Sequence, residues 1–181
     1  MKKVVISIVL ALIMLTCSSC SRVFLLNLSG DERALANERF ENLLDKLESK
    51  DFEEVKALFA ESAKQTEDFD EKLSILINYY KGESYNYDDH GTGPGVYTRN
   101  KYGTKMVTYR NSYDVYTTED TYRMYFIDTV RNDFDENEVG IISLYIIKYK
   151  YDTTPEFGYV GDGKRTPGIH MKTGDGGVSC I

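Results

Sequence analysis

Helical and strand-like patterns occupy separate parts of this chain, and this separation constrains its fold more than any other feature. Apolar side chains recur at helical spacing within residues 32–49, at Ala36, Phe40, Leu43, Leu44 and Leu47. All 15 tyrosines lie from Tyr79 onward, in segments that are typical of half-buried strands. Helices followed by strands predict an α+β domain, because a βαβ fold would interleave the two kinds of element.

Two more helices are predicted before residue 82. Asp51 and Glu54 have the spacing of a capping box, which predicts the start of a short second helix. A third helix is predicted to start at Asp68 or Asp70 and to end at Gly82, since glycine adopts the left-handed conformation that often terminates a helix.

Three strands are predicted in the tyrosine-rich part, over residues 105–117, 121–130 and 139–151. Residues 131–138 are predicted to be an acidic hairpin loop, and residues 157–169 a glycine-rich loop with a short strand. The helices have to bury their apolar stripes on one face of the resulting antiparallel sheet. We therefore expect a curved sheet that wraps around the helices as a cone, whose open end is a usual place for a ligand.

The first 20 residues have the pattern of a lipoprotein signal peptide. Lys2 and Lys3 precede an apolar run over residues 4–14, which is shorter than the roughly 20 residues that a helix needs to cross a bilayer. Two serines directly before Cys20 favour that cysteine as the site of lipid attachment, and Cys17 is the alternative site. An uncut N-terminal membrane anchor is the other interpretation of this segment.

The predicted organisation is a lipoprotein signal peptide at residues 1–19, a short tether at 20–29, one α+β domain at 30–170 and a flexible tail at 171–181. We expect the mature protein to be lipid-anchored on the extracytoplasmic face of the cell membrane, because several acyl chains on one cysteine hold firmly. The expected partners are the membrane, reached through this lipid anchor, and an unidentified small ligand or envelope protein.

The composition is acidic. The chain has 22 basic and 29 acidic side chains, and removal of Lys2 and Lys3 leaves 20 basic against 29 acidic, a net charge of −9. No basic stripe is evident in the sequence, so nucleic acid is excluded as a partner. Anionic lipid headgroups are poor partners for the same reason, and the lipid anchor is expected to hold the membrane by itself.

The sequence predicts no metal site and no cofactor. Residues 133–138 supply the first three ligand positions of a calcium loop, but Glu138 stands where that loop needs glycine and Leu144 where it needs glutamate. His90 and His170 have no second histidine or cysteine at ligand spacing, which argues against a zinc site. No serine has the surroundings of a nucleophile elbow.

One candidate pocket can be drawn from strand alternation. Asp128 shares a predicted face with Tyr122, Met124 and Phe126, and Tyr145 on the next strand completes the candidate pocket. On a concave face, Asp128 would lie in an apolar pocket, its pKa would be raised, and it could act as a base. The interpretation that we favour is that Asp128 ends its strand and faces water, because an ionised aspartate is rarely buried without a partner.

Several segments resemble known families. Residues 50–59, between two helices, look like the start of a nuclear-transport-factor-2-like (cystatin-like) domain. An uncharacterised family of Gram-positive lipoproteins, domain of unknown function 5104, is similar to this chain at residues 121–128, 139–147, 157–159 and 166–169. The resemblance covers roughly residues 30–170. It implies a cone-shaped α+β fold, surface tethering and no established activity, and it supplies no catalytic residues.

Two functions from different classes follow as hypotheses. The first, which we predict, is a surface-tethered lipoprotein whose domain binds a ligand or protein without catalysis. The alternative is an enzyme of the isomerase or dehydratase kind that uses Asp128 and nearby tyrosines. Sugar binding on tyrosine faces is a weaker third hypothesis, because the chain contains no tryptophan.

Overall fold

The computed structural model describes residues 34–89, 94–151 and 167–172. The chain divides into two units, Met1–Glu38 and Arg39–Ile181, and the second unit contains the sheet. The predicted signal peptide, tether and lipid-attachment cysteine lie outside the described residues, as do most of the glycine-rich loop and most of the tail.

The described helical segments before the sheet are residues 34–49, α2 (Phe52–Ala57), α3 (Glu61–Lys64) and α4 (Phe69–Tyr79). The carboxylate of Asp51 accepts a hydrogen bond from the backbone N–H of Glu54 at 3.0 Å, so the predicted capping of α2 is confirmed. Asp68 is the N-cap of α4, one of the two predicted starts. The helix ends three residues before Gly82, because the backbone of Tyr80 is already extended. The sequence did not predict α3, which is a single turn.

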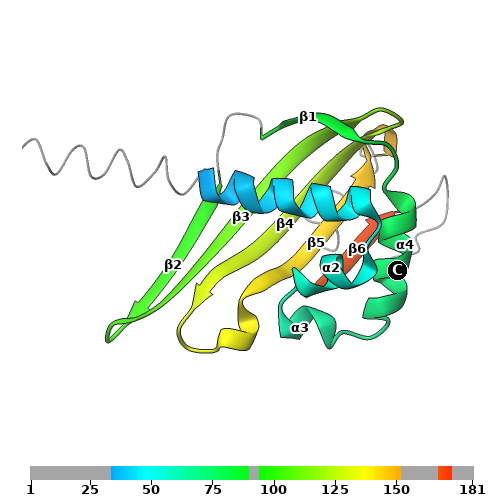
Figure 1. Cartoon of the computed structure of the whole chain (residues 1–181). Coiled ribbons are helices and arrows are strands. Elements are labelled where there is room, and N and C mark those ends of the chain that lie inside the picture. The colour runs from blue at the N-terminus through cyan, green and yellow to red at the C-terminus, as the bar shows by residue number, and fades with distance from the viewer. Residues whose placement is uncertain (1–33, 90–93, 152–166, 173–181) are drawn as a thin grey trace, which may run out of the picture. The chain divides into compact units, whose positions relative to one another are not determined.

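The described strands form one curved, unclosed sheet: β1 (Ser84–Asp88), β2 (Gly95–Lys101), β3 (Thr104–Thr117), β4 (Thr121–Asn132), β5 (Gly140–Lys148) and β6 (Gly168–Lys172). The order is β1-β3-β4-β5-β6, and β2 also pairs with β3. Figure 1 shows β1 and β2 following each other along the same edge of β3. The predicted α+β class is confirmed.

Three predictions about the strands need correction. The strands β1 and β2 were not predicted. The third predicted strand is too long, because residues 149–151 turn into a short 3-10 helix after β5. The last strand, β6, pairs in parallel with β5, so the sheet is not purely antiparallel, and β6 includes Met171 and Lys172 from the predicted tail.

The core lies between the helices and one face of the sheet, which we call the inner face and which carries Tyr113, Tyr122, Met124 and Phe126. The ring of Phe40 stacks on Tyr113 with the centroids 3.7 Å apart, so the first predicted helical stripe packs on the sheet as expected. No helix in the described ranges has the length and hydrophobicity needed to cross a membrane.

Backbone pairing joins the helical layer to the start of β5. Phe59 forms an isolated parallel bridge with Ile141, and the N–H of Ile141 donates to the carbonyl oxygen of Leu58 at 2.8 Å. Gly140 makes this approach possible, because a Cβ there would lie 2.8 Å from the backbone nitrogen of Ala60, and its φ of +127° is one that other residues rarely adopt.

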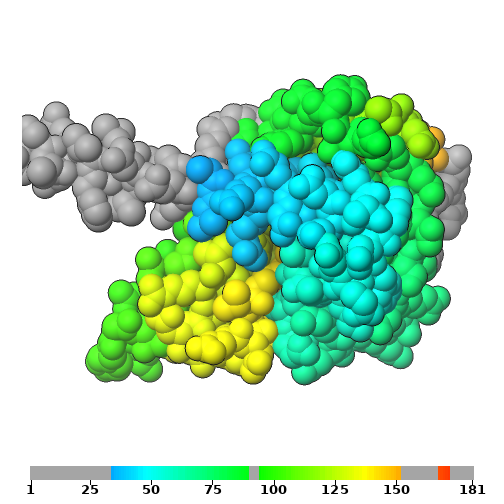
Figure 2. All heavy atoms as spheres, in the orientation of Figure 1, coloured from blue at the N-terminus to red at the C-terminus, as the bar shows by residue number. Residues whose placement is uncertain are grey.

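The hairpin of β2 and β3 extends beyond the helical layer (Figure 2). All seven residues of β2 are exposed. Tyr102 and Gly103 form the turn of this hairpin, and both have positive φ, at 52° and 86°, which is the backbone that a two-residue β-hairpin turn requires.

Candidate functional site

Asp128 of β4 is the buried carboxylate on the inner face, with a relative exposure of 1%. Arg39, from the helix at 34–49, approaches it with two donors. Its Nη2 donates to Oδ1 of Asp128 at 2.7 Å, and its Nε donates to Oδ2. The arrangement is a bidentate ion pair, which compensates the buried charge with good geometry.

This geometry corrects one expectation and weakens another. The favoured interpretation, that Asp128 ends its strand and faces water, is wrong, because β4 continues to Asn132 and the carboxylate is buried. The role of a general base needs an oxygen that can reach a substrate proton. Both oxygens of Asp128 already accept hydrogen bonds from Arg39, so the described geometry is that of a structural ion pair.

The three other predicted pocket residues on β4 are part of the core. The structure places Tyr122, Met124 and Phe126 on the inner face, each no more than 1% exposed. The ring centroid of Phe126 lies 5.6 Å from that of Phe40, and the ring of Tyr122 stacks on Tyr80 at 5.1 Å. These side chains therefore fill the space that the sequence assigned to a ligand.

The structure does not bring Tyr145 together with these residues. Tyr145 pairs across the strands with Tyr125, and Phe126 pairs with Leu144, so Tyr145 belongs to the opposite face of the sheet. Its ring stacks on His170 of β6 at a centroid distance of 4.2 Å. The sequence could not place Tyr145 correctly because its face depends on the register between β4 and β5.

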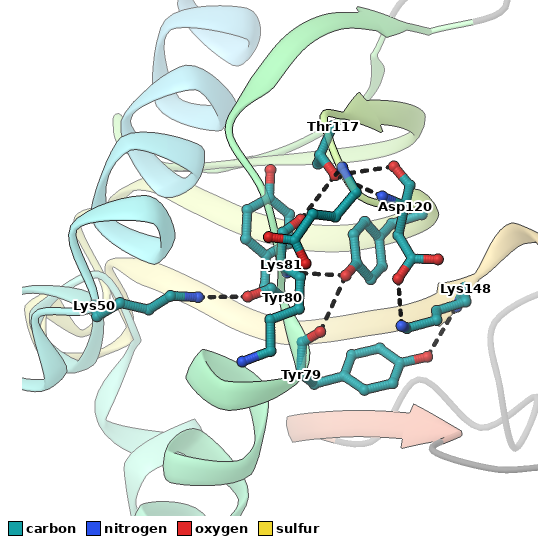
Figure 3. Close-up of polar contacts among 9 residues, drawn as sticks. Lys50, Tyr79, Tyr80, Lys81, Thr117, Asp120 and Lys148 are labelled. Carbon is teal, nitrogen blue, oxygen red and sulfur yellow. Dashed lines mark hydrogen bonds and ion pairs between the residues drawn. The ribbon is translucent and has the colours of Figure 1, made fainter.

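Figure 3 shows a second group of polar contacts, where the end of α4 meets the β3–β4 turn and the end of β5. The hydroxyl of Tyr122 accepts from the backbone N–H of Lys81 at 2.9 Å and donates to the carbonyl of Tyr79 at 3.0 Å. The hydroxyl of Tyr79 accepts from the backbone N–H of Lys148 at 2.9 Å. The ammonium group of Lys148 forms an ion pair with Asp120.

The phenols in this group are suited to holding structure rather than to proton transfer. Burial raises the pKa of Tyr79 and that of Tyr122 to about 12, so both hydroxyls stay protonated at neutral pH. Lys50 adds to the same group by donating to the carbonyl of Ile77 at 2.8 Å, which satisfies a free acceptor near the end of α4. A shallow depression of about 430 Å³ lies beside it, lined by residues 117–121, Tyr149 and Lys150.

Metal ligands are not gathered in the described part of the chain. No group of three or more histidine, cysteine, aspartate or glutamate side chains there could hold a metal ion. The carboxylate of Asp133 instead forms an ion pair with Arg131, which lowers its pKa to about 2. His90 lies outside the described residues.

Arg39 is the residue that the sequence analysis missed. A signal for it was present, because Arg39 directly precedes Phe40 of the apolar stripe and so lies at the border of the buried helix face. A buried aspartate also needs a cation, which should have prompted a search for a partner.

Comparison with known proteins adds one match. A family model described as "Domain of unknown function (DUF5104)" matches residues 42–149, more than half of the chain. No curated protein matches the chain.

Proposed function

The chain belongs to the DUF5104 family, a domain of unknown function, and we propose from its own residues that it is a lipid-tethered, non-catalytic binding domain. The tether is the acylated Cys20, exposed after removal of residues 1–19, and the domain faces away from the cytoplasm. The finer family assignment, to Gram-positive lipoproteins with a cone-shaped nuclear-transport-factor-2-like fold, belongs to the same proposal. A curved sheet with helices on one face supports it.

The ion pair of Arg39 and Asp128 is the observation that carries the non-catalytic part of the proposal. It engages the one buried carboxylate that the sequence offered as a base. The neighbouring side chains Tyr122, Met124 and Phe126 belong to the buried core. Binding in this proposal uses the outside of the domain, where exposed backbone and side chains such as those of β2 are available.

The tether is tested by mass spectrometry of the membrane-extracted protein. We expect a chain that begins at a diacylglycerol-modified Cys20. Cys20→Ala should abolish both cleavage and lipid attachment, because the acylated thiol is what the processing step uses. Cys17→Ala is the matched control and should be processed like the unchanged chain. An intact Met1, or a processed start without fatty acid, would overturn the proposal.

A further inference from the structure

The β2–β3 hairpin concentrates positive charge on an acidic protein. Residues 95–110 contain four basic side chains and no acidic one, whereas the whole chain has a net charge of −7. The four are Arg99, Lys101, Lys105 and Arg110. The prediction that the sequence has no basic stripe is therefore wrong for this hairpin. The acidic residues lie elsewhere in the chain.

These four cations differ in their partners from Arg39, Arg123 and Lys148. Arg39, Arg123 and Lys148 each form an ion pair with a carboxylate. Within the described ranges, none of the four hairpin cations forms one. Asp133 lies close enough to Lys105 to interact with its charge, so the cations that remain for a partner are above all Arg99 and Lys101 on β2.

Aromatic rings hold the two arginines. The guanidinium of Arg99 lies 4.9 Å from the ring centroid of Phe134, and that of Arg110 lies 5.7 Å from the centroid of Tyr97. The Nε of Arg110 is buried and has no hydrogen-bond partner. Stacking orients a guanidinium while leaving its in-plane N–H groups free, and these N–H groups match a carboxylate.

The backbone of β2 is also available for hydrogen bonds with a partner. Among the described strands it pairs only with β3, so its other edge is free. Lys101 pairs with Thr104 across the two-residue turn, and the alternation of an antiparallel ladder then directs the backbone groups of Val96, Thr98 and Asn100 to the free edge. Such an edge is a template for a further strand.

We propose that β2 is the docking edge for an acidic peptide segment of a partner protein, which adds as a strand and sets its carboxylates against Arg99 and Lys101. The proposal deepens the binding function proposed above and rests on it. Two observations together favour this partner. The unpaired backbone groups of the β2 edge can form hydrogen bonds with an added strand, and the cations of β2 without an ion pair can bind carboxylates.

Other occupants could supply either a pairing strand or negative charge, but not both. A second copy that paired through its own β2 would bring the cations of both strands together, and lysine on an edge strand works against such self-pairing. An anionic membrane would attract Arg99 and Lys101 but would leave the backbone groups of the free edge without partners.

The experiment measures fluorescence anisotropy of labelled peptides with the full chain in detergent micelles. The probe is a peptide in which glutamate and threonine alternate, and we expect it to bind. A lysine-threonine peptide tests the sign of the charge, and a glutamate-proline peptide tests the need for a strand, since proline cannot donate to a ladder. Neither control peptide should bind.

Two pairs of variants separate charge from backbone. Arg99→Glu should weaken binding by at least about tenfold, whereas Lys72→Glu on α4, with the same change in total charge, should have little effect. Thr98→Pro removes an outward N–H and should also abolish binding, whereas Thr98→Val should keep it. Circular dichroism confirms that each variant is folded.

Several results would overturn the proposal. Equal binding of the glutamate-proline peptide would show attraction to any polyanion. Absence of peptide binding would refute the docking edge, and capture by phosphatidylglycerol vesicles would then assign the hairpin to the membrane. Sedimentation as a dimer that Arg99→Glu dissociates would assign it to a second copy. None of these measurements depends on the lipid at Cys20. The result for the docking edge and the result for the lipid tether can therefore be told apart.

Discussion

At the scale of single residues, the most informative contact joins positions 89 apart in the chain. Strand alternation was enough to place Asp128 on the same face as Tyr122, Met124 and Phe126. It could not show that Arg39 would neutralise the carboxylate, because the local sequence of β4 contains no information about which helix packs on it. The candidate site predicted from the sequence thus had the right face of one strand, but it lacked the arginine that pairs with the carboxylate.

A structural ion pair predicts a specific pattern of stability. Asp128→Asn removes the charge that Arg39 pairs with in the core and should lower the free energy of unfolding by about 3 kcal/mol, the lower end for a buried pair because the Arg39 side chain is 34% exposed. Replacing both residues, Arg39→Met with Asp128→Leu, should recover most of the loss, since apolar residues of similar volume can replace a buried pair.

Urea denaturation of the single and double variants measures this pattern. A double variant that is no more stable than the sum of two independent losses would contradict a pairwise role for Arg39 and Asp128.

At the scale of elements, short backbone contacts determine how the helices meet the sheet. The link between Phe59 and Ile141 joins the connection after α2 to the start of β5. The sequence predicted α2 and β5 separately, each from its own periodicity, but their contact has no periodic signal. The same limit explains why β2 was missed, since the turn of Tyr102 and Gly103 is not one of the common asparagine-glycine or aspartate-glycine hairpin pairs.

Two glycines test the importance of this link. Gly140→Ala should destabilise the protein by about 3 kcal/mol, because it adds a backbone collision to an unfavourable φ. Gly103 is the matched control, with a φ of +86° but no atom within 4 Å of an added Cβ. Gly103→Ala should therefore cost only about 1 kcal/mol, which represents the conformational strain alone.

Thermal unfolding of both variants gives the comparison. Equal losses at Gly140 and Gly103 would mean that the close approach to Ala60 contributes nothing.

At the scale of the whole molecule, several tyrosines belong to the core or form hydrogen bonds between elements. Tyr80, Tyr113, Tyr122 and Tyr145 are among the largest fully buried side chains. This agrees with the interpretation of tyrosine as a strand-forming residue. Burial of the phenols of Tyr79, Tyr87 and Tyr122 ties the stability of the fold to their protonation.

The consequence is a loss of stability in alkali. Burial raises the pKa of Tyr79, Tyr87 and Tyr122 from 10.0 to about 12. The folded state therefore holds these protons more tightly than the unfolded state, so their contribution is complete below pH 10.0 and is lost as the pH rises to about 12.

An alkaline titration followed by tyrosinate absorbance and by circular dichroism measures this loss. We expect the late part of the absorbance rise to coincide with unfolding, and Tyr122→Phe should reduce it. Complete ionisation near pH 10 in a folded protein would contradict the assignment.

The sequence alone determined the fold class, the two faces of β4 and the cap of α2, because periodicity and capping are properties of neighbouring residues. The sequence also contains the four basic residues of the hairpin at 95–110, which the net charge of −7 for the whole chain does not reveal. Only the tertiary structure decided that Arg39 meets Asp128, that Tyr145 faces away from Phe126 and that β2 pairs with β3 alone among the described strands. Each of these depends on register or on contacts between distant segments, and the energy of such contacts exists only once the chain has brought those segments together.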